Sequence, residues 1–115
     1  MGKEKELEGM EMEEKEEEAV DFMKVKFSKA YDFDGGRKIT EIDLSGLEEL
    51  TARDMIQIGK EMRSRGNTDA SPEFTMEFSL YAAMHVTEFP LEFFLGLSAK
   101  DAMKVKLRVN YFFAR

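Results

Sequence analysis

The stretch Phe89–Met103, FPLEFFLGLSAKDAM, places three phenylalanines and three leucines within its first nine residues. Pro90, the second residue of this stretch, ends the preceding helix, because the residue before a proline is disfavoured in the helical conformation. Ser98 begins the next helix, since a serine followed three residues later by an acid is a helix-start signal. A connector between two helices needs no such apolar content for flexibility or solubility. The stretch therefore predicts core and contact surface.

The helix expected before this stretch spans about 72–88. Ser71 is its predicted N-cap, and Pro72 occupies the first helical position, where a missing N–H costs nothing. Because apolar side chains cover two sides of this helix, we expect it to be central and buried on both flanks. The two sets are Phe74, Phe78, Tyr81 and His85 on one side, and Met76, Leu80, Ala83 and Met84 on the other.

The last helix is expected over about 99–113, and it also has two apolar sides. Its main face consists of Ala102, Val105, Val109, Phe112 and Phe113. A sparser stripe of Met103, Leu107 and Tyr111 runs down the opposite side, between Lys100, Lys104 and Arg108. An earlier helix, about 52–65, begins at Thr51, ends at Gly66 and has a single stripe of Met55, Ile58 and Met62, which is typical of a surface helix.

The N-terminal half predicts a β-hairpin. Apolar residues alternate with polar ones from Met23 to Phe33, and the turn Asp34–Gly36 leads into a return strand that ends at Leu44. Ile39 is out of phase with the return strand, so we expect a bulge near Thr40. Two strands alone are marginally stable. The predicted fold is therefore α+β and mostly helical, with the hairpin packed on three main helices.

The net charge is concentrated in residues 1–20, which hold nine Glu against three Lys, a net charge of −6. Such an acidic, low-complexity run predicts a disordered tail before a single domain over 21–115. That domain has 14 basic and 15 acidic residues and no basic stripe, which argues against nucleic-acid binding. No window resembles a membrane span or a secretory signal, so we expect a cytoplasmic protein.

The residues that could perform chemistry are few. Without cysteine there is no thiolate nucleophile and no cysteine-based metal site. The lone His85 lies on an aromatic stripe, where a hydrogen-bonded, partly buried histidine is expected. No pair of carboxylates stands out for acid–base work, and no phosphate-binding loop is present. We therefore predict no enzyme, no catalytic residue, no metal and no cofactor.

The hairpin turn partly matches a calcium-binding loop. Asp32, Asp34, Gly35 and Glu41 fall at positions 3, 5, 6 and 12 of the EF-hand template. Position 1 would be Ala30, however, and the flanks alternate as strands although an EF-hand requires helices there. A plain β-turn is the preferred interpretation.

The helices carry more apolar surface than a domain of this size is expected to bury, so some of it should contact a partner. Phe89 is assigned to the core. For the remaining candidates, burial within the domain and contact with a partner are both open. These candidate partner-binding residues are Phe93, Phe94, Met103, Leu107 and Tyr111.

Three stretches, taken in order, resemble the small tail assembly chaperones of long-tailed bacteriophages and prophages, especially those of Gram-positive hosts. They are FDGGRKITEIDLSGLEELTARDM, SPEFTMEFSLYAAMHVTEFPLEFFLGLSAKDAMKVK and RVNYFF, which together cover about residues 31–113. They resemble the family's hairpin turn, its two helix starts, and its aromatic pair after a proline. The acidic N-terminal segment departs from the family pattern.

The resemblance implies a non-enzymatic helper of virion morphogenesis. Such proteins coat the long helical tape-measure protein, self-associate into oligomers, and are absent from the mature virion. The implied partners are the tape-measure protein and, as a second candidate, the tail-tube protein, in the cytoplasm of the host bacterial cell. Two alternatives stay open: a structural virion component of the head–tail connector type, and a small calcium-binding protein that uses Asp32, Asp34 and Glu41.

Overall fold

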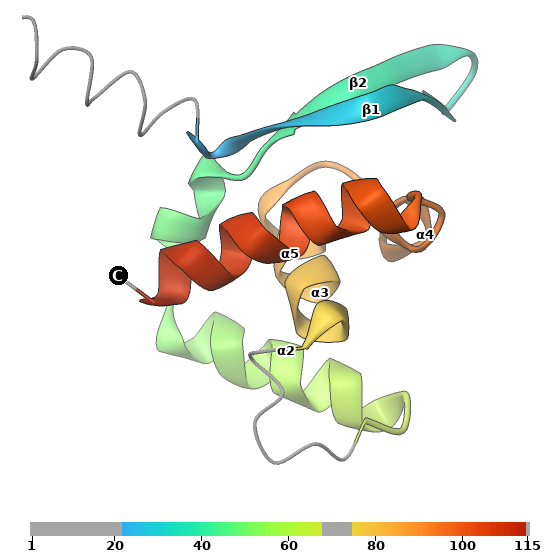
Figure 1. Ribbon diagram of the computed structural model, residues 1–115. Helices are drawn as coiled ribbons and strands as arrows, with labels where there is room; N and C mark the ends of the chain where they lie inside the picture. The colour runs from blue at the N-terminus through green and yellow to red at the C-terminus, as the bar shows by residue number, and fades with distance from the viewer. Residues whose placement is uncertain (1–21, 68–74, 115) are drawn as a thin grey trace, which may run out of the picture.

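The computed structural model describes residues 22–67 and 75–114. In Figure 1 the hairpin lies across one side of α5, while α2 lies on the side of the molecule away from the hairpin. The expected α+β class, a hairpin followed by helices, is confirmed. The elements are β1 (Lys24–Phe33), β2 (Arg37–Asp43), the 3-10 helix η1 (Ser45–Glu49), α2 (Ala52–Ser64), α3 (Met76–Val86), α4 (Leu91–Leu95) and α5 (Ala99–Ala114). The acidic segment 1–20 lies outside the described residues.

The hairpin is antiparallel and turns where the sequence predicts it. Asp34, Gly35 and Gly36 all have positive φ, the conformation for which a glycine-rich turn is suited. The regular pairing is interrupted between Lys26, which faces Glu41, and Tyr31, which faces Ile39. Residues 27–30 of β1 therefore lie opposite residue 40 alone. The irregularity is at the expected place, but its extra residues belong to β1, and it lets the out-of-phase Ile39 become buried.

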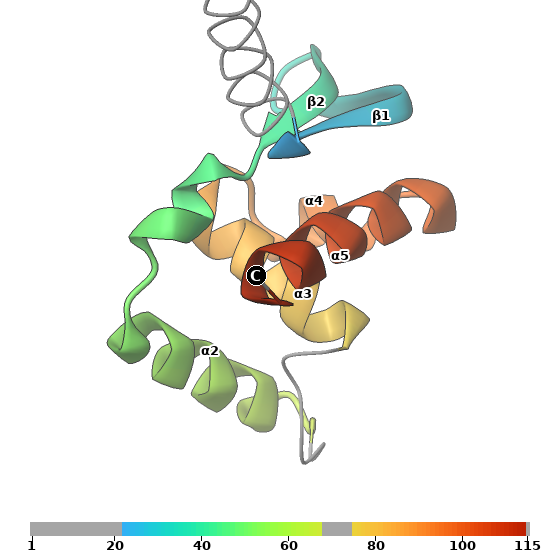
Figure 2. The same cartoon turned by 60° about the vertical axis from the view of Figure 1, so that its left-hand side comes forward.

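The central helix is α3, as predicted, because side chains all around it are buried. They are Phe78, Ser79, Leu80, Tyr81, Ala82 and Ala83. The expected start of this helix at Ser71 and Pro72 is wrong. The helix begins at Met76, since Thr75 has an extended backbone and its side chain accepts a hydrogen bond from the amide of Phe78. Residues 68–74 lie outside the described part of the chain. Figure 2 shows α3 between α5 and α2.

Helix α2 has the ends that the sequence predicts. The side chain of Thr51 accepts from the amide of Asp54, and the Asp54 carboxylate accepts from the amide of Thr51, which completes a capping box. Gly66, with φ of 95°, follows the last turn. Within the described ranges, no helix is both long enough and apolar enough to cross a bilayer.

The short helix η1 was not anticipated, and it packs closely on the end of α3. A Cβ at Gly46 would lie 3.0 Å from Val86 Cβ and 3.1 Å from the Val86 carbonyl oxygen. We expect Gly46→Ala to lower the free energy of unfolding by about 1–3 kcal/mol, because the backbone must shift to admit the methyl group. Urea unfolding followed by circular dichroism measures this.

The matched control for that substitution is Gly59→Ala on α2. Its Cβ would meet only the Arg63 guanidinium, at 3.4 Å, which is the flexible end of a long side chain. Alanine is favoured over glycine inside a helix by about 0.5–1 kcal/mol, so this variant should be more stable than the parent. Equal effects of the two substitutions would contradict the close packing of η1 on α3.

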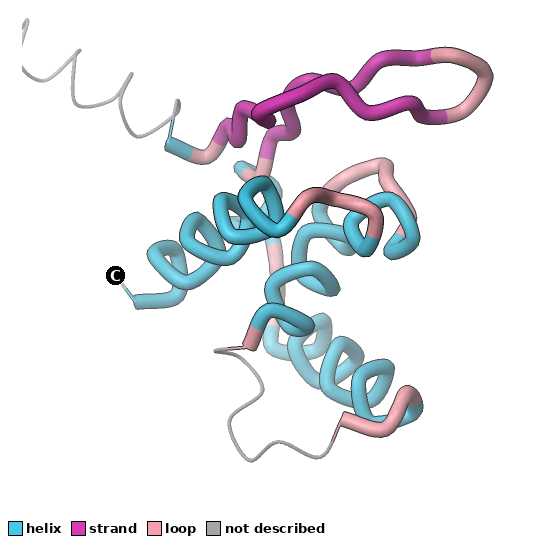
Figure 3. The backbone as a smooth tube through the Cα atoms, turned by 45° about the vertical axis from the view of Figure 1, so that its right-hand side comes forward, coloured by secondary structure: helices cyan, strands magenta, loops and turns pink. Residues whose placement is uncertain are grey.

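The apolar connector forms core, as its composition indicates. Helix α4 is a single short turn in which Leu91 and Phe94 are buried, and Phe89 and Leu97 are buried on either side of it. The Phe33 ring of the hairpin meets Phe89 edge-on at 5.1 Å between centroids. Figure 3 shows the connector folded back beside the start of α5, beneath the hairpin. The connector therefore joins the hairpin to the helices.

Candidate functional site

Helix α5 is buried on one side and exposed, but apolar, on the other. Ala102, Val105 and Val109 lie in the core. On the opposite side, Met103 is 43%, Leu107 55% and Tyr111 52% exposed. Their spacing of four residues places them on successive turns of one stripe. Three large apolar side chains in a row on the surface are a candidate contact site, whereas isolated ones are common on any protein.

Basic residues border this stripe. We call the stripe and its bordering cations the α5 face: Met103, Leu107 and Tyr111 with Lys100, Lys104, Lys106 and Arg108. The only carboxylate within α5 is Asp101, and it is fully buried. Among the described residues, no acidic partner pairs with Lys100, Lys106 or Arg108. The α5 face is therefore apolar along its centre and positive along its edges.

Lys104 is held at the hairpin edge of this face. Its Nζ donates to the carbonyl oxygen of Lys26 at 2.9 Å and lies 3.6 Å from Asp101 Oδ1. Arg108 instead stacks over the ring of Phe22, with 4.5 Å from its guanidinium carbon to the ring centroid. The Phe22 ring also packs on Tyr111 at 4.3 Å. The chain thus enters the described fold directly beside the C-terminal half of the α5 face.

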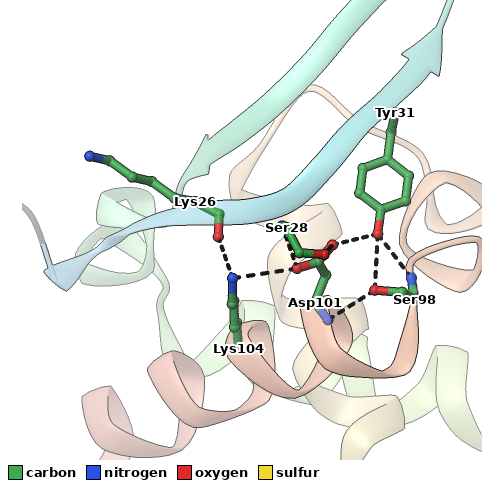
Figure 4. A network of polar contacts seen from close by, with 6 residues as sticks. All are labelled: Lys26, Ser28, Tyr31, Ser98, Asp101 and Lys104. Carbon is green, nitrogen blue, oxygen red and sulfur yellow. Dashed lines mark hydrogen bonds and ion pairs between the residues drawn. The ribbon is translucent and has the colours of Figure 1, made fainter.

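A buried carboxylate fixes α5 against the hairpin. Asp101 Oδ1 accepts from the Ser28 amide at 2.8 Å, and Oδ2 accepts from the Ser28 hydroxyl at 2.9 Å and the Tyr31 hydroxyl at 2.5 Å. The Tyr31 oxygen accepts in turn from the amide of Ser98, the N-cap of α5, at 3.0 Å. Figure 4 shows these groups converging between β1 and the first turn of α5. The network orients α5 so that its stripe faces outward.

The environment of Asp101 keeps it ionised. Burial by itself would raise the pKa of this carboxyl, but hydrogen bonds from Tyr31 and from the amide and hydroxyl of Ser28 outweigh that effect and lower the pKa from 3.8 to about 2. The sequence identified Asp101 only as a helix-start acid. Its long-range partners Ser28 and Tyr31 lie more than sixty residues away, and no local pattern reveals them.

The five candidate partner-binding residues do not form one surface. Met103, Leu107 and Tyr111 lie together on the α5 face. The prediction that Phe94 can contact a partner is wrong, because its ring is 1% exposed and fills the core. Phe93 is partly buried, stacked on Phe89 at 4.5 Å and meeting Phe33 edge-on at 5.8 Å. It belongs to the aromatic cluster under the hairpin.

His85 and the hairpin turn occupy structural positions. His85 is partly buried, as expected, and its Nε2 lies 3.0 Å from Oε2 of Glu61 on α2. At the turn, Asp32 pairs with Lys38, and strands flank the loop where an EF-hand has helices. Within the described residues, no three His, Cys, Asp or Glu side chains are grouped so as to hold a metal ion.

A recess lies between α3 and α4. It has a volume of about 430 Å³, and Arg65, Met76, Glu77, Leu80, Tyr81, Leu91 and Leu95 line it. The Tyr81 hydroxyl is buried and has no hydrogen-bond partner among the described residues, and burial raises the pKa of this phenol. Four of the seven lining residues are apolar, and the Arg65 guanidinium lies over the Tyr81 ring, 5.9 Å from its centroid.

No family model, no curated protein and no solved structure matches the chain.

Proposed function

We propose that the chain is a non-enzymatic tail assembly chaperone of a bacteriophage or prophage, which binds the tape-measure protein and keeps it soluble until tail-tube subunits polymerise around it. The observation that carries the proposal is the exposed apolar stripe of α5, held outward by a buried polar network. The resemblance of residues 31–113 to that family supplies the client. In this proposal the protein acts in the host cytoplasm and is absent from the mature virion.

The α5 face suits the apolar side of an amphipathic helix. Sixteen residues of α5 extend for about 24 Å, and Met103, Leu107 and Tyr111 offer anchors at every turn of its central part. Methionine adapts its shape to varied apolar side chains, and tyrosine combines a large apolar area with a polar end. A client with many similar helices could therefore be covered by many copies of one chaperone.

A single shallow stripe gives only weak binding, and weak binding fits a protein that must leave its client when the tube assembles. Self-association would offset the weakness, because linked copies present several stripes and bind with higher avidity. We therefore propose a homo-oligomer as the working form. The cations along the α5 face favour clients whose apolar side is bordered by carboxylates.

Leu107→Glu tests the proposed contact. Leu107 is at the centre of the stripe and 55% exposed, so the substitution should not unfold the protein. We expect affinity for a helical tape-measure fragment to fall at least tenfold, about 1.4 kcal/mol, and co-expression to leave that fragment insoluble. The measurement is the soluble fraction of the fragment after co-expression, with binding followed by fluorescence anisotropy.

Ile56→Glu on α2 is the matched control, because Ile56 is 60% exposed but lies outside the α5 face. It should leave client solubility unchanged. Equal solubility of the fragment with both variants would contradict the proposal. Mass spectrometry of mature particles separates the proposal from the structural-component alternative, because a chaperone should be absent from them and a connector present.

A further inference from the structure

The α5 face has a candidate occupant within the same chain. Residues 1–20 carry a net charge of −6, from nine Glu and three Lys, and they lie just before Phe22 in the chain. Phe22 packs on Tyr111 and under Arg108, at one end of the α5 face. The acidic segment therefore emerges beside Arg108, which, like Lys100 and Lys106 on the same face, has no carboxylate partner among the described residues.

The geometry points to an intramolecular occupant: we propose that residues 1–21 cover the α5 face when no client is bound and leave it when a client binds. The second half of this inference rests on the proposed function, since it takes the α5 face to be the client site. In that role the segment acts as a built-in competitor, which shields the stripe of an unoccupied chaperone from indiscriminate apolar contacts.

Distance does not prevent this docking. Met103 and Tyr111 are eight residues apart on α5, or about 12 Å along the helix axis. An extended chain covers about 3.3 Å per residue, so roughly four residues upstream of Phe22 span that length. The segment has Leu7, Met10 and Met12 to offer to the stripe, and its glutamates to offer to the bordering cations.

Electrostatics favour this occupant over a second copy of the α5 face. Two such faces would bring the three unpaired cations of one copy against the three of the other, whereas the acidic segment brings opposite charge. Exposed ion pairs are individually weak and are screened by salt, so docking should be reversible and salt-sensitive. Both properties are required of a competitor that a client displaces.

The test uses the full chain and no client. The protein has no cysteine, so Gly9→Cys accepts a single nitroxide spin label. With methionine methyl groups labelled with carbon-13, the label should broaden the Met103 signal on the α5 face far more than that of Met62, a buried residue of α2. At about 1 M salt, where the Debye length is about 3 Å, the extra broadening should disappear. Equal broadening at Met103 and Met62 at low salt overturns the inference.

Two further samples show whether the glutamates hold the segment in place and whether it docks on its own chain. The first sample is the labelled chain with three neutralised glutamates, Glu13→Gln/Glu14→Gln/Glu16→Gln, and it should lose the broadening at Met103. Its control neutralises three exposed carboxylates elsewhere, Glu41→Gln/Glu49→Gln/Glu92→Gln, and should keep the broadening. In a mixture of spin-labelled chains with separate carbon-13 chains, Met103 should stay sharp. Broadening in that mixture would make a second copy the occupant and overturn the intramolecular proposal.

The affinity for a client fragment tests the competitor role separately from docking. The variant neutralised at residues 13, 14 and 16 should bind a tape-measure fragment about three- to tenfold more tightly, because less charge competes for the α5 face. Docking without any change in client affinity would overturn the competitor role. A chain that shows docking but binds no client would refute the proposed function instead, so the two failures are distinguishable.

Discussion

Replacement of Asp101 by asparagine should lower the free energy of unfolding by about 2–4 kcal/mol, because three donors from the hairpin lose a charged acceptor in a buried site. These donors are the Ser28 amide, the Ser28 hydroxyl and the Tyr31 hydroxyl. An asparagine is neutral and offers one oxygen in place of two, so it cannot accept all three hydrogen bonds in the same geometry. Urea unfolding at pH 6 measures the loss.

The loss should depend on pH. The pKa of Asp101 is about 2 in the fold and 3.8 in the reference state, so its carboxylate stabilises the protein above about pH 4 and ceases to do so as the pH falls towards 2. A pKa difference of that size corresponds to about 2 kcal/mol. The stability gap between the parent and Asp101→Asn should therefore shrink by about 2 kcal/mol between pH 6 and pH 2.

Asp54→Asn is the matched control, since Asp54 has the same position relative to the N-cap of α2 as Asp101 has relative to that of α5. Within the described part of the chain, the Asp54 side chain forms hydrogen bonds with Thr51 only, three residues away on the surface. Its loss should be smaller than that of Asp101→Asn. Equal losses for both variants would mean that Asp101 serves only as a helix cap and does not fix α5 to the hairpin.

Local signals in the sequence were sufficient for most of the fold. Alternation located β1, the positive-φ turn located the hairpin, and capping residues located the starts of α2 and α5, because each of these is decided by neighbours in the chain. The start of α3 was misplaced because a serine–proline pair resembles a cap as closely as Thr75 does. The helix η1 went unpredicted, since Gly46 is required there by a distant contact with Val86.

Local signals in the sequence identified only part of the candidate site. Helical spacing separated Met103, Leu107 and Tyr111 from the core side of α5, and these three are exposed. The same reasoning could not separate Phe93 from Phe94, because a five-residue helix has too few positions to define a face. Nor could it place Phe22 beside Tyr111, a contact across most of the chain.

Phe94→Ala should be the most destabilising substitution in the connector, lowering the free energy of unfolding by about 3–5 kcal/mol. The Phe94 ring is 1% exposed and meets the rings of Phe93 at 5.3 Å and Phe89 at 6.4 Å. Its removal leaves a cavity beneath the hairpin that these neighbours cannot close without leaving their own positions. Such a loss is a large part of a total stability of about 5–15 kcal/mol, and it would unfold a domain at the lower end of that range.

Phe93→Ala is the companion variant, and Phe94→Leu keeps the measurement possible if Phe94→Ala does not fold. Phe93 is only partly buried, so its removal should cost clearly less than that of Phe94. Phe94→Leu retains most of the apolar volume and should fold with a measurable loss of about 1 kcal/mol. If Phe94 instead belonged to a partner surface, Phe94→Ala would leave unfolding unchanged and abolish client binding. Urea unfolding and the client assay, run on the same three variants, therefore decide whether the connector anchors the fold or contacts the partner.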